Sequence, residues 1–190
     1  MTLSKDKQFL DACRTGNLAE AKQLVLGGVN LNCTDSLKQV TALMYAIEHK
    51  QNNIIDWLIS KPTVDVDRHN KWQNTALHYA ARYSEDGILV AALGNRMRRE
   101  TVNLKNKDQL TAVVRAIRWN NGNIRALQGL LSVRSVDFDD TNLLHEARLV
   151  YLVLRMSNFI TCLIKAIELT LCKKSHNLLG FFMIVYIQST

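Results

Sequence analysis

The chain has 190 residues, enough for one compact domain or for one short repeat array with a tail. Its 47% hydrophobic and 22% charged residues exclude a largely disordered chain, and its single proline and 8 glycines exclude a collagen-like or proline-rich one. The formal net charge is +7. The four cysteines form no C-x-x-C pair, so we expect reduced thiols rather than a disulfide framework or a zinc site. Because the first residues lack a signal-peptide core, we expect a cytoplasmic location, with the nucleus as the alternative.

Two short patterns recur along the chain. The first is a valine followed by a turn rich in Asn and Asp, at spacings of 35, 38 and 34 residues; it begins at Val29, Val64, Val102 and Val136. The second is led by a threonine, at spacings of 34, 36 and 30 residues; it begins at Thr41, Thr75, Thr111 and Thr141. Two independent markers with one period indicate a repeat architecture.

Each repeat predicts two helices and a turn. Residues 17–26 form an amphipathic segment that should end at Gly27, and residues 53–59 and 123–131 are its counterparts. In the third unit, Thr75 is suited to cap a helix whose apolar and small residues repeat at helical spacing. A unit of this size cannot bury its own apolar face, so we expect consecutive units to stack into a solenoid.

Residues 74–81 read N-T-A-L-H-Y-A-A, which resembles the T-P-L-H-x-A-A motif of the ankyrin-repeat family. The resemblance covers residues from about 5 to 148, with a degenerate first repeat, three full repeats and a broken fifth. It implies an all-α solenoid of stacked helix-turn-helix units, in which His78 hydrogen-bonds a neighbouring loop. Met44 and Val114 occupy the equivalent positions and cannot make that bond, so those junctions should be weaker.

The chain departs from the family pattern at several places, and Ala42, Ala76 and Ala112 stand where the family has proline. Glutamine replaces the hairpin glycine at Gln39, Gln73 and Gln109. Residues 94–100 carry Arg96, Arg98 and Arg99, and we interpret them as a long, solvated basic loop where the family has a tight turn.

The repeat pattern stops after Arg148, so we place the repeats at residues 1–148 and a hydrophobic C-terminal extension at residues 149–190. In this extension 26 of 42 residues are apolar. Three interpretations remain open: a helical cap on the array, a non-native terminus, or a membrane-contacting segment. Membrane contact is not favoured, because charges such as Lys165 and Glu168 interrupt the apolar runs.

The sequence contains no catalytic motif, and its histidines are scattered, so we expect neither an enzyme nor a bound metal or cofactor. Asp65 and Asp67 form a carboxylate pair at a repeated turn position, which predicts turn formers rather than acid–base groups.

Candidate binding residues are the ones that an ankyrin-like array presents on its concave side. These partner-binding candidates are Lys38, Glu48, His49, Lys71, Trp72, Asn74, Arg82, Tyr83, Lys107, Asp108, Leu110, Arg118 and Trp119. Exposed Trp, Tyr and Arg carry much of the binding energy at protein interfaces. Arg82–Tyr83 and Arg118–Trp119 hold equivalent positions one repeat apart, so we expect them to lie side by side. The alternative is that these aromatic rings pack back onto their own neighbours.

These observations predict a non-catalytic protein-interaction module, an adaptor or scaffold, whose basic and aromatic groove binds an acidic protein partner with apolar anchors. A nucleic-acid or nucleotide-binding array is the first alternative, although a net charge of +4 over residues 1–148 is modest for that role. The second alternative is a fragment or isoform of a larger protein whose other domain carries the activity.

Overall fold

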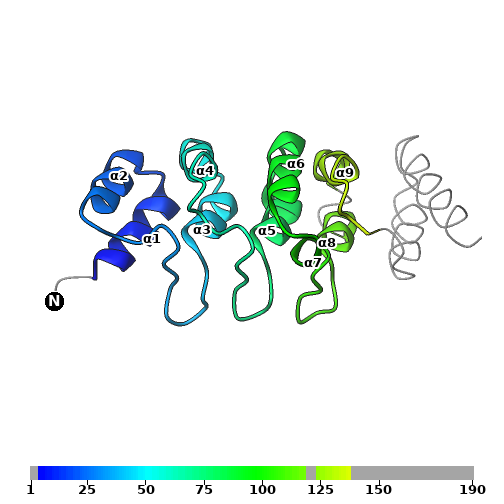
Figure 1. Ribbon diagram of the computed structural model, residues 1–190, viewed down its shortest axis with the longest axis horizontal. Coiled ribbons are helices and arrows are strands. Elements are labelled where there is room, and N and C mark those ends of the chain that lie inside the picture. The colour runs from blue at the N-terminus through cyan, green and yellow to red at the C-terminus, as the bar shows by residue number, and fades with distance from the viewer. Residues whose placement is uncertain (1–3, 119–122, 138–190) are drawn as a thin grey trace, which may run out of the picture. The chain divides into compact units, whose positions relative to one another are not determined.

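The computed structural model describes residues 4–118 and 123–137 (Figure 1). The chain divides into two compact units, Met1–Val136 and Asp137–Thr190, and the description below concerns the first unit. The predicted fifth repeat and the predicted extension at residues 149–190 lie outside the described residues.

The described part of the chain contains nine helices and no strand. They are α1 (Lys5–Thr15), α2 (Leu18–Leu26), α3 (Ala42–Glu48), α4 (Asn52–Ile59), α5 (Ala76–Tyr83), α6 (Gly87–Arg96), α7 (Arg99–Val102), α8 (Ala112–Arg118) and α9 (Ile124–Leu131).

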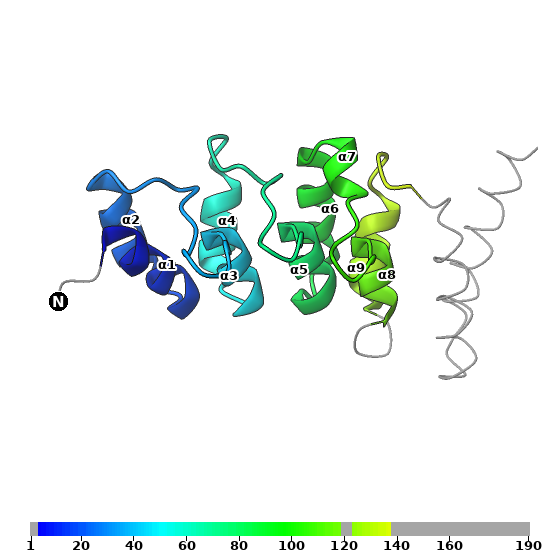
Figure 2. The ribbon, with the colours of Figure 1, turned by 90° about the horizontal axis from the view of Figure 1, so that it is seen from below.

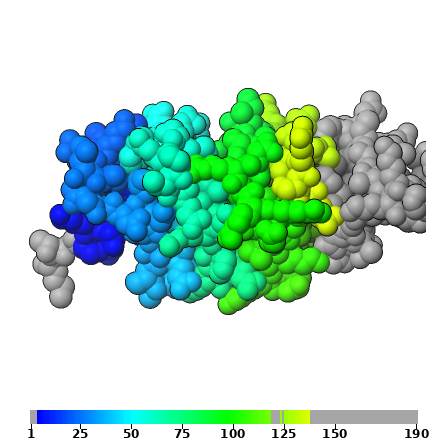
Figure 3. Space-filling view, in the orientation of Figure 1, coloured from blue at the N-terminus to red at the C-terminus, as the bar shows by residue number. Residues whose placement is uncertain are grey.

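Eight of the nine described helices form four stacked pairs, and the short α7 lies between the third pair and the fourth along the chain. An inner row consists of α1, α3, α5 and α8, each packed on the next, and each inner helix also packs on its own outer helix, α2, α4, α6 or α9 (Figures 1 and 2). The space-filling view shows the pairs in contact as successive bands (Figure 3). This arrangement confirms the predicted all-α solenoid.

The threonines of the second pattern set where the inner helices begin. The hydroxyl oxygens of Thr41, Thr75 and Thr111 each accept a hydrogen bond from the backbone N–H three residues later, at 3.2, 3.5 and 3.3 Å. A side chain at this position satisfies a donor that has no partner within the helix. The predicted cap at Thr75 is therefore confirmed.

Small residues let the helices of neighbouring pairs approach closely. In α5, Leu77, Ala80 and Ala81 are completely buried, as their spacing predicts. Between α6 and α9 the contact is closer still, because a Cβ atom added at Gly129 would collide with the backbone oxygen of Gly87.

Polar side chains of the valine-led pattern join successive repeats. The side chain of Asn32 donates to the carbonyl oxygen of Thr63 and accepts from the N–H of Asp65, both at 2.8 Å. Asp65 in turn accepts from the N–H of Asp67 at 3.1 Å. The interpretation as a turn former is confirmed for Asp65, whereas the Asp67 carboxylate accepts from Arg98 of the next repeat.

Each hairpin between repeats reverses at a residue with left-handed backbone geometry. Gln39, Gln73 and Gln109 have φ values of 57°, 60° and 60°. This region is costly for residues that carry a Cβ atom, which is why glycine is common there. The fold therefore holds these glutamines in the left-handed backbone conformation that glycine usually adopts.

The prediction of a long solvated loop at residues 94–100 is wrong. Helix α6 continues to Arg96 and α7 begins at Arg99. The Arg96 guanidinium donates three hydrogen bonds of 2.7 Å, to backbone carbonyl oxygens at the end of α4 and in the turn after it: Ile59, Lys61 and Val64. Arg98 pairs with Asp67, with 3.1 Å between Nε and Oδ2. Arg96 and Arg98 therefore connect repeats.

Candidate partner-binding surface

An Asp or Asn side chain five or six residues before the capping threonine closes each of the three described hairpins. The Asp35 carboxylate accepts from the N–H groups of Leu37, Lys38 and Val40, at 3.0, 2.6 and 3.0 Å. Asn70 and Asn106 repeat this role: the Asn70 side-chain oxygen accepts from two N–H groups in its hairpin at 2.9 and 3.0 Å, and that of Asn106 accepts from two at 3.0 Å each. These bonds hold the hairpins in one shape, so their tips are positioned before any partner arrives.

Backbone hydrogen bonds join neighbouring hairpins near their tips. The N–H of Lys71 donates to the carbonyl oxygen of Lys38, and that of Lys107 donates to the carbonyl oxygen of Trp72, each at 3.0 Å. The three hairpins project to the same side of the array and end at a similar level (Figure 1). We call the exposed charged and apolar residues there the tip row; they are Leu37, Lys38, Lys71, Trp72, Lys107 and Asp108.

A second set of side chains lies along the inner helices. Tyr45, Tyr79 and Arg115 each follow a capping threonine by four residues. The Tyr45 hydroxyl donates to Asp35 at 3.1 Å, the Tyr79 hydroxyl oxygen accepts from the Asn70 amide at 3.0 Å, and the Arg115 guanidinium donates to the side-chain oxygen of Asn74. One helix position therefore supports the hairpins in three successive repeats.

Arg82 and Tyr83, at the end of α5, lie beside this set. The Arg82 guanidinium carbon is 4.8 Å from the centre of the Tyr83 ring, and that ring is 5.9 Å from the Tyr79 ring. The Tyr83 hydroxyl donates to the Glu48 carboxylate of the preceding repeat at 3.4 Å. We call Glu48, Tyr79, Arg82, Tyr83 and Arg115 the inner-helix cluster.

Burial and neighbouring charges set the protonation states in this region. Desolvation raises the pKa of Tyr79 and Tyr83, so both hydroxyls stay protonated at neutral pH. Burial, and then the charge of Asp35, raises the pKa of Tyr45 to about 12. Burial, followed by repulsion from Arg82, lowers the pKa of Arg115, which remains a cation. The cluster therefore combines neutral tyrosine rings with two like-charged guanidinium groups.

His78 joins the third and fourth repeats beneath this surface. Its Nε2 donates to the carbonyl oxygen of Leu110 at 3.0 Å, and its Nδ1 accepts from the N–H of Thr75 at 3.3 Å. This confirms the loop contact that the ankyrin resemblance implies. Burial lowers the His78 pKa to about 4, so the ring is neutral at pH 7.

The predicted binding residues differ in how they are placed. Lys38, His49, Lys71, Trp72, Lys107, Asp108 and Arg118 are exposed, while Glu48, Arg82, Tyr83 and Leu110 are half-buried. Trp72 is 39% exposed, and the Lys71 ammonium lies 4.6 Å from the centre of its ring. Trp119 lies outside the described residues, so its expected position beside Arg82 and Tyr83 stays a prediction.

Asn74 requires a correction. Its side chain is buried, and its oxygen accepts from the Asn106 amide at 2.8 Å as well as from Arg115. An oxygen with two internal donors supports the hairpins and is not available to a partner.

Sequence reasoning missed Arg115, Tyr45 and Tyr79, because it expects only the hairpin tips and the end of each inner helix to face a partner. Their common spacing from the capping threonine was the available signal. It also missed Leu37, which is 79% exposed at the first hairpin tip.

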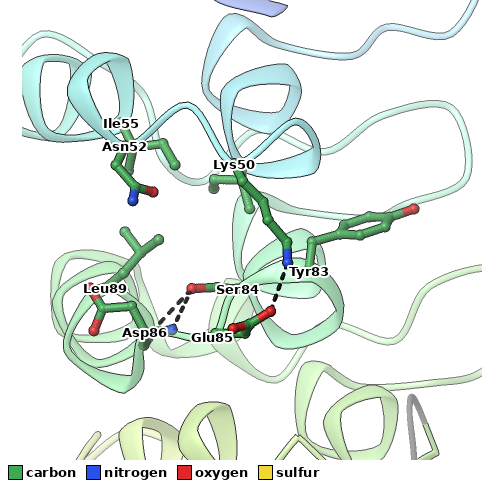
Figure 4. A pocket seen from close by; sticks show the side chains of 9 residues that line it. Lys50, Asn52, Ile55, Tyr83, Ser84, Glu85, Asp86 and Leu89 are labelled. Atoms are coloured by element: carbon green, nitrogen blue, oxygen red, sulfur yellow. Dashed lines mark hydrogen bonds and ion pairs between the residues drawn. The ribbon is translucent and has the colours of Figure 1, made fainter. Parts of the chain in front are cut away.

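A hollow of about 230 Å³ lies between the second and third repeats, away from the tip row (Figure 4). Ile47, Ile55 and Leu89 supply its apolar side chains. Lys50 and Glu85 form an ion pair of 2.7 Å across it. Its volume is below that of usual small-molecule sites. Within residues 4–118 and 123–137 there is no group of three His, Cys, Asp or Glu that could hold a metal ion.

Residues 9–93 match the family model for ankyrin repeats, in three copies. This part of the chain consists of ankyrin repeats. No curated protein matches it. Ankyrin repeats are generally non-catalytic protein–protein interaction modules. The helix pair α8–α9 lies beyond the matched residues, yet it begins with the same threonine cap and follows the same kind of hairpin. None of the described helices is long and apolar enough to cross a membrane.

Proposed function

We propose that this ankyrin array is a non-catalytic adaptor or scaffold whose inner-helix cluster binds an acidic protein segment with apolar anchors. The observation that carries the proposal is the inner-helix cluster itself, in which Arg82 and Tyr83 of the third repeat lie with Arg115 of the fourth and Glu48 of the second.

The chemistry of the cluster favours a protein partner. Tyr and Arg are over-represented among the residues that dominate binding energy at protein interfaces. Stacking of Arg82 on Tyr83 already restricts both side chains, so a partner has less side-chain entropy to remove on binding.

The charges favour an acidic partner. In α3, α5 and α8, the cations Arg82, Arg115 and Arg118 outnumber the acidic Glu48. Repulsion between Arg82 and Arg115 would be relieved by a carboxylate bound near both. Complementary charge also accelerates encounter with an acidic partner.

Selection from a random peptide library displayed on phage tests this proposal without a known partner. Peptides enriched on the wild-type protein should combine Asp or Glu with aromatic or aliphatic residues. The double variant Arg82→Ala/Tyr83→Ala should bind these peptides at least about ten-fold more weakly, since each lost anchor costs 1 kcal/mol or more.

The matched control is Lys22→Ala/Leu26→Ala, which removes one cation and one exposed apolar residue from the outer helix α2. It should bind the peptides like the wild type, and circular dichroism should show equal helicity for all three proteins. Enriched peptides without an acidic excess, or equal weakening by both double variants, would refute the proposed site.

Nucleic-acid binding is the second candidate, favoured by the two cations stacked on Trp72 and Tyr83. Phosphate-driven affinity falls steeply as salt rises. Binding of single-stranded oligonucleotides that weakens by orders of magnitude between 50 and 200 mM salt, and that depends on Arg82 and Trp72, would favour this candidate over the protein-binding one.

A further inference from the structure

The tip row differs from the inner-helix cluster in chemistry and in shape. It lies at the ends of three hairpins that project to one side and form a row along the array (Figures 1 and 2). Backbone hydrogen bonds of 3.0 Å between neighbouring hairpins keep the tips in register. The residues of the tip row are therefore held in fixed positions relative to one another along the array.

The row has a cationic and apolar composition. Lys38, Lys71 and Lys107 are all exposed, and Asp108 is the one acidic residue of the row. Leu37 is 79% exposed, and the side chain of Trp72 is partly exposed. An excess of lysines around an aliphatic residue and a tryptophan is typical of surfaces that rest on anionic lipid headgroups.

Three details favour a lipid surface over an acidic protein. The tips end at a similar level, so a flat surface can meet all of them together (Figure 1). Leu37 is 79% exposed at a tip, where an apolar side chain can enter the apolar layer of a membrane. Trp72 has a lysine ammonium 4.6 Å from its ring centre, which pairs an interfacial aromatic group with a cation at the same depth.

We propose that the tip row rests on an anionic membrane surface, with Lys38, Lys71 and Lys107 on the lipid headgroups and Leu37 and Trp72 between them. This contact is peripheral and reversible. It does not use the residues of the inner-helix cluster, so the array can bind a protein segment while its hairpins contact lipid.

Co-flotation of the full chain with vesicles tests the proposal. Vesicles with 30 mol% phosphatidylserine in phosphatidylcholine should bind the protein, and vesicles of pure phosphatidylcholine should bind it far more weakly. In Lys38→Gln/Lys71→Gln/Lys107→Gln, partitioning into the anionic vesicles should fall by about 100-fold, because each lysine near such a surface contributes about five-fold.

The matched control is Lys7→Gln/Lys22→Gln/Arg99→Gln, which removes the same charge from exposed positions outside the tip row. It should retain most of the vesicle binding. Residues 138–190 are identical in both variants, so any contribution from them cancels. Equal losses in the two variants would show that binding follows net charge, and would overturn the proposal.

Leu37→Ser separates a bilayer from other polyanions, because it changes no charge. It should weaken vesicle binding several-fold and leave binding to soluble polyglutamate unchanged. The membrane proposal is wrong if the vesicles do not bind. It is also wrong if Leu37→Ser has no effect on vesicle binding while polyglutamate binding depends on the three lysines, because the row is then a protein-binding surface. These outcomes do not involve Arg82 or Tyr83, so they leave the protein-binding proposal to its own test.

Discussion

The Nε2 atom of His78 lies 3.0 Å from the carbonyl oxygen of Leu110, which belongs to the next hairpin along the array. This bond crosses between repeats, and the same ring also closes the first turn of α5 through Thr75. One buried imidazole therefore joins a helix cap to a repeat junction, and its protonation state matters to both.

Acid should weaken the array through His78. Because the unfolded chain binds this proton near pH 6.5 and the folded chain only near pH 4, the unfolded state gains protons first as pH falls. We expect the free energy of unfolding to fall by up to about 1.4 kcal/mol per pH unit across this window. Urea denaturation at pH 7.5, 6.5, 5.5 and 4.5 measures the slope.

The variant His78→Gln should flatten this pH dependence, although it starts from a lower stability. The control is His49→Gln, at an exposed position at the end of α3, which should keep the wild-type slope. An unchanged slope in His78→Gln would rule out His78 as the titrating group.

Asp35 should not contribute to the slope in this pH range. Although partial burial opposes it, hydrogen bonds from backbone N–H groups of the first hairpin keep the pKa of Asp35 below its ordinary value, so the stability that Asp35 contributes is lost at lower pH.

Glycine at a hairpin reversal should stabilise the protein. Gln73→Gly removes the cost of left-handed geometry for a residue with a Cβ atom, and the net gain should be about 0.5–1 kcal/mol after the entropy of glycine in the unfolded chain is subtracted. Gln23→Gly, in the interior of α2, should instead destabilise the protein by about 1 kcal/mol. Thermal unfolding of both variants measures the two changes in stability. If both variants are stabilised or both are destabilised, the strain argument is contradicted.

A methyl group at Gly129 should separate α6 from α9. The added Cβ atom would meet the backbone oxygen of Gly87 and the side chain of Val90, and backbone cannot move aside as a flexible side chain does. We expect Gly129→Ala to destabilise the fourth repeat by about 1–3 kcal/mol. Gln128→Ala, at the exposed neighbouring position, should be nearly neutral in the same chemical denaturation experiment. Stability of Gly129→Ala equal to the wild type would mean that the two helices do not approach this closely.

Arg96→Ala should loosen the contact between the second and third repeats. The change leaves three carbonyl oxygens without the guanidinium that they share, and we expect a loss of about 2–3 kcal/mol in the free energy of unfolding. Arg96→Lys should recover only part of this loss, because an ammonium lacks the planar fork of donors. Arg99→Ala, at an exposed position of α7, is the control and should change little in urea denaturation. Similar losses in the two alanine variants would contradict the assigned role.

The repeat architecture could be predicted from the sequence because its causes are local. The spacing of Thr41, Thr75 and Thr111 fixes where the inner helices start, and a hydroxyl that caps its own helix needs no other part of the chain. Once the period is known, stacking follows, since no single unit can cover its apolar face. For the candidate site, the exposed lysines and Trp72 at the tips could be predicted in the same way.

Contacts between repeats were decided only by the tertiary structure. Arg96 looked like a member of a solvated basic loop, yet the end of α4 brings three carbonyl oxygens to it. Asn74 looked like a surface residue, yet Asn106 and Arg115 occupy its oxygen. A polar side chain has the same sequence signature whether it faces water or an internal partner. Its role depends on which groups the neighbouring repeat places within hydrogen-bond distance, and residues some 30 to 40 positions away supply those groups.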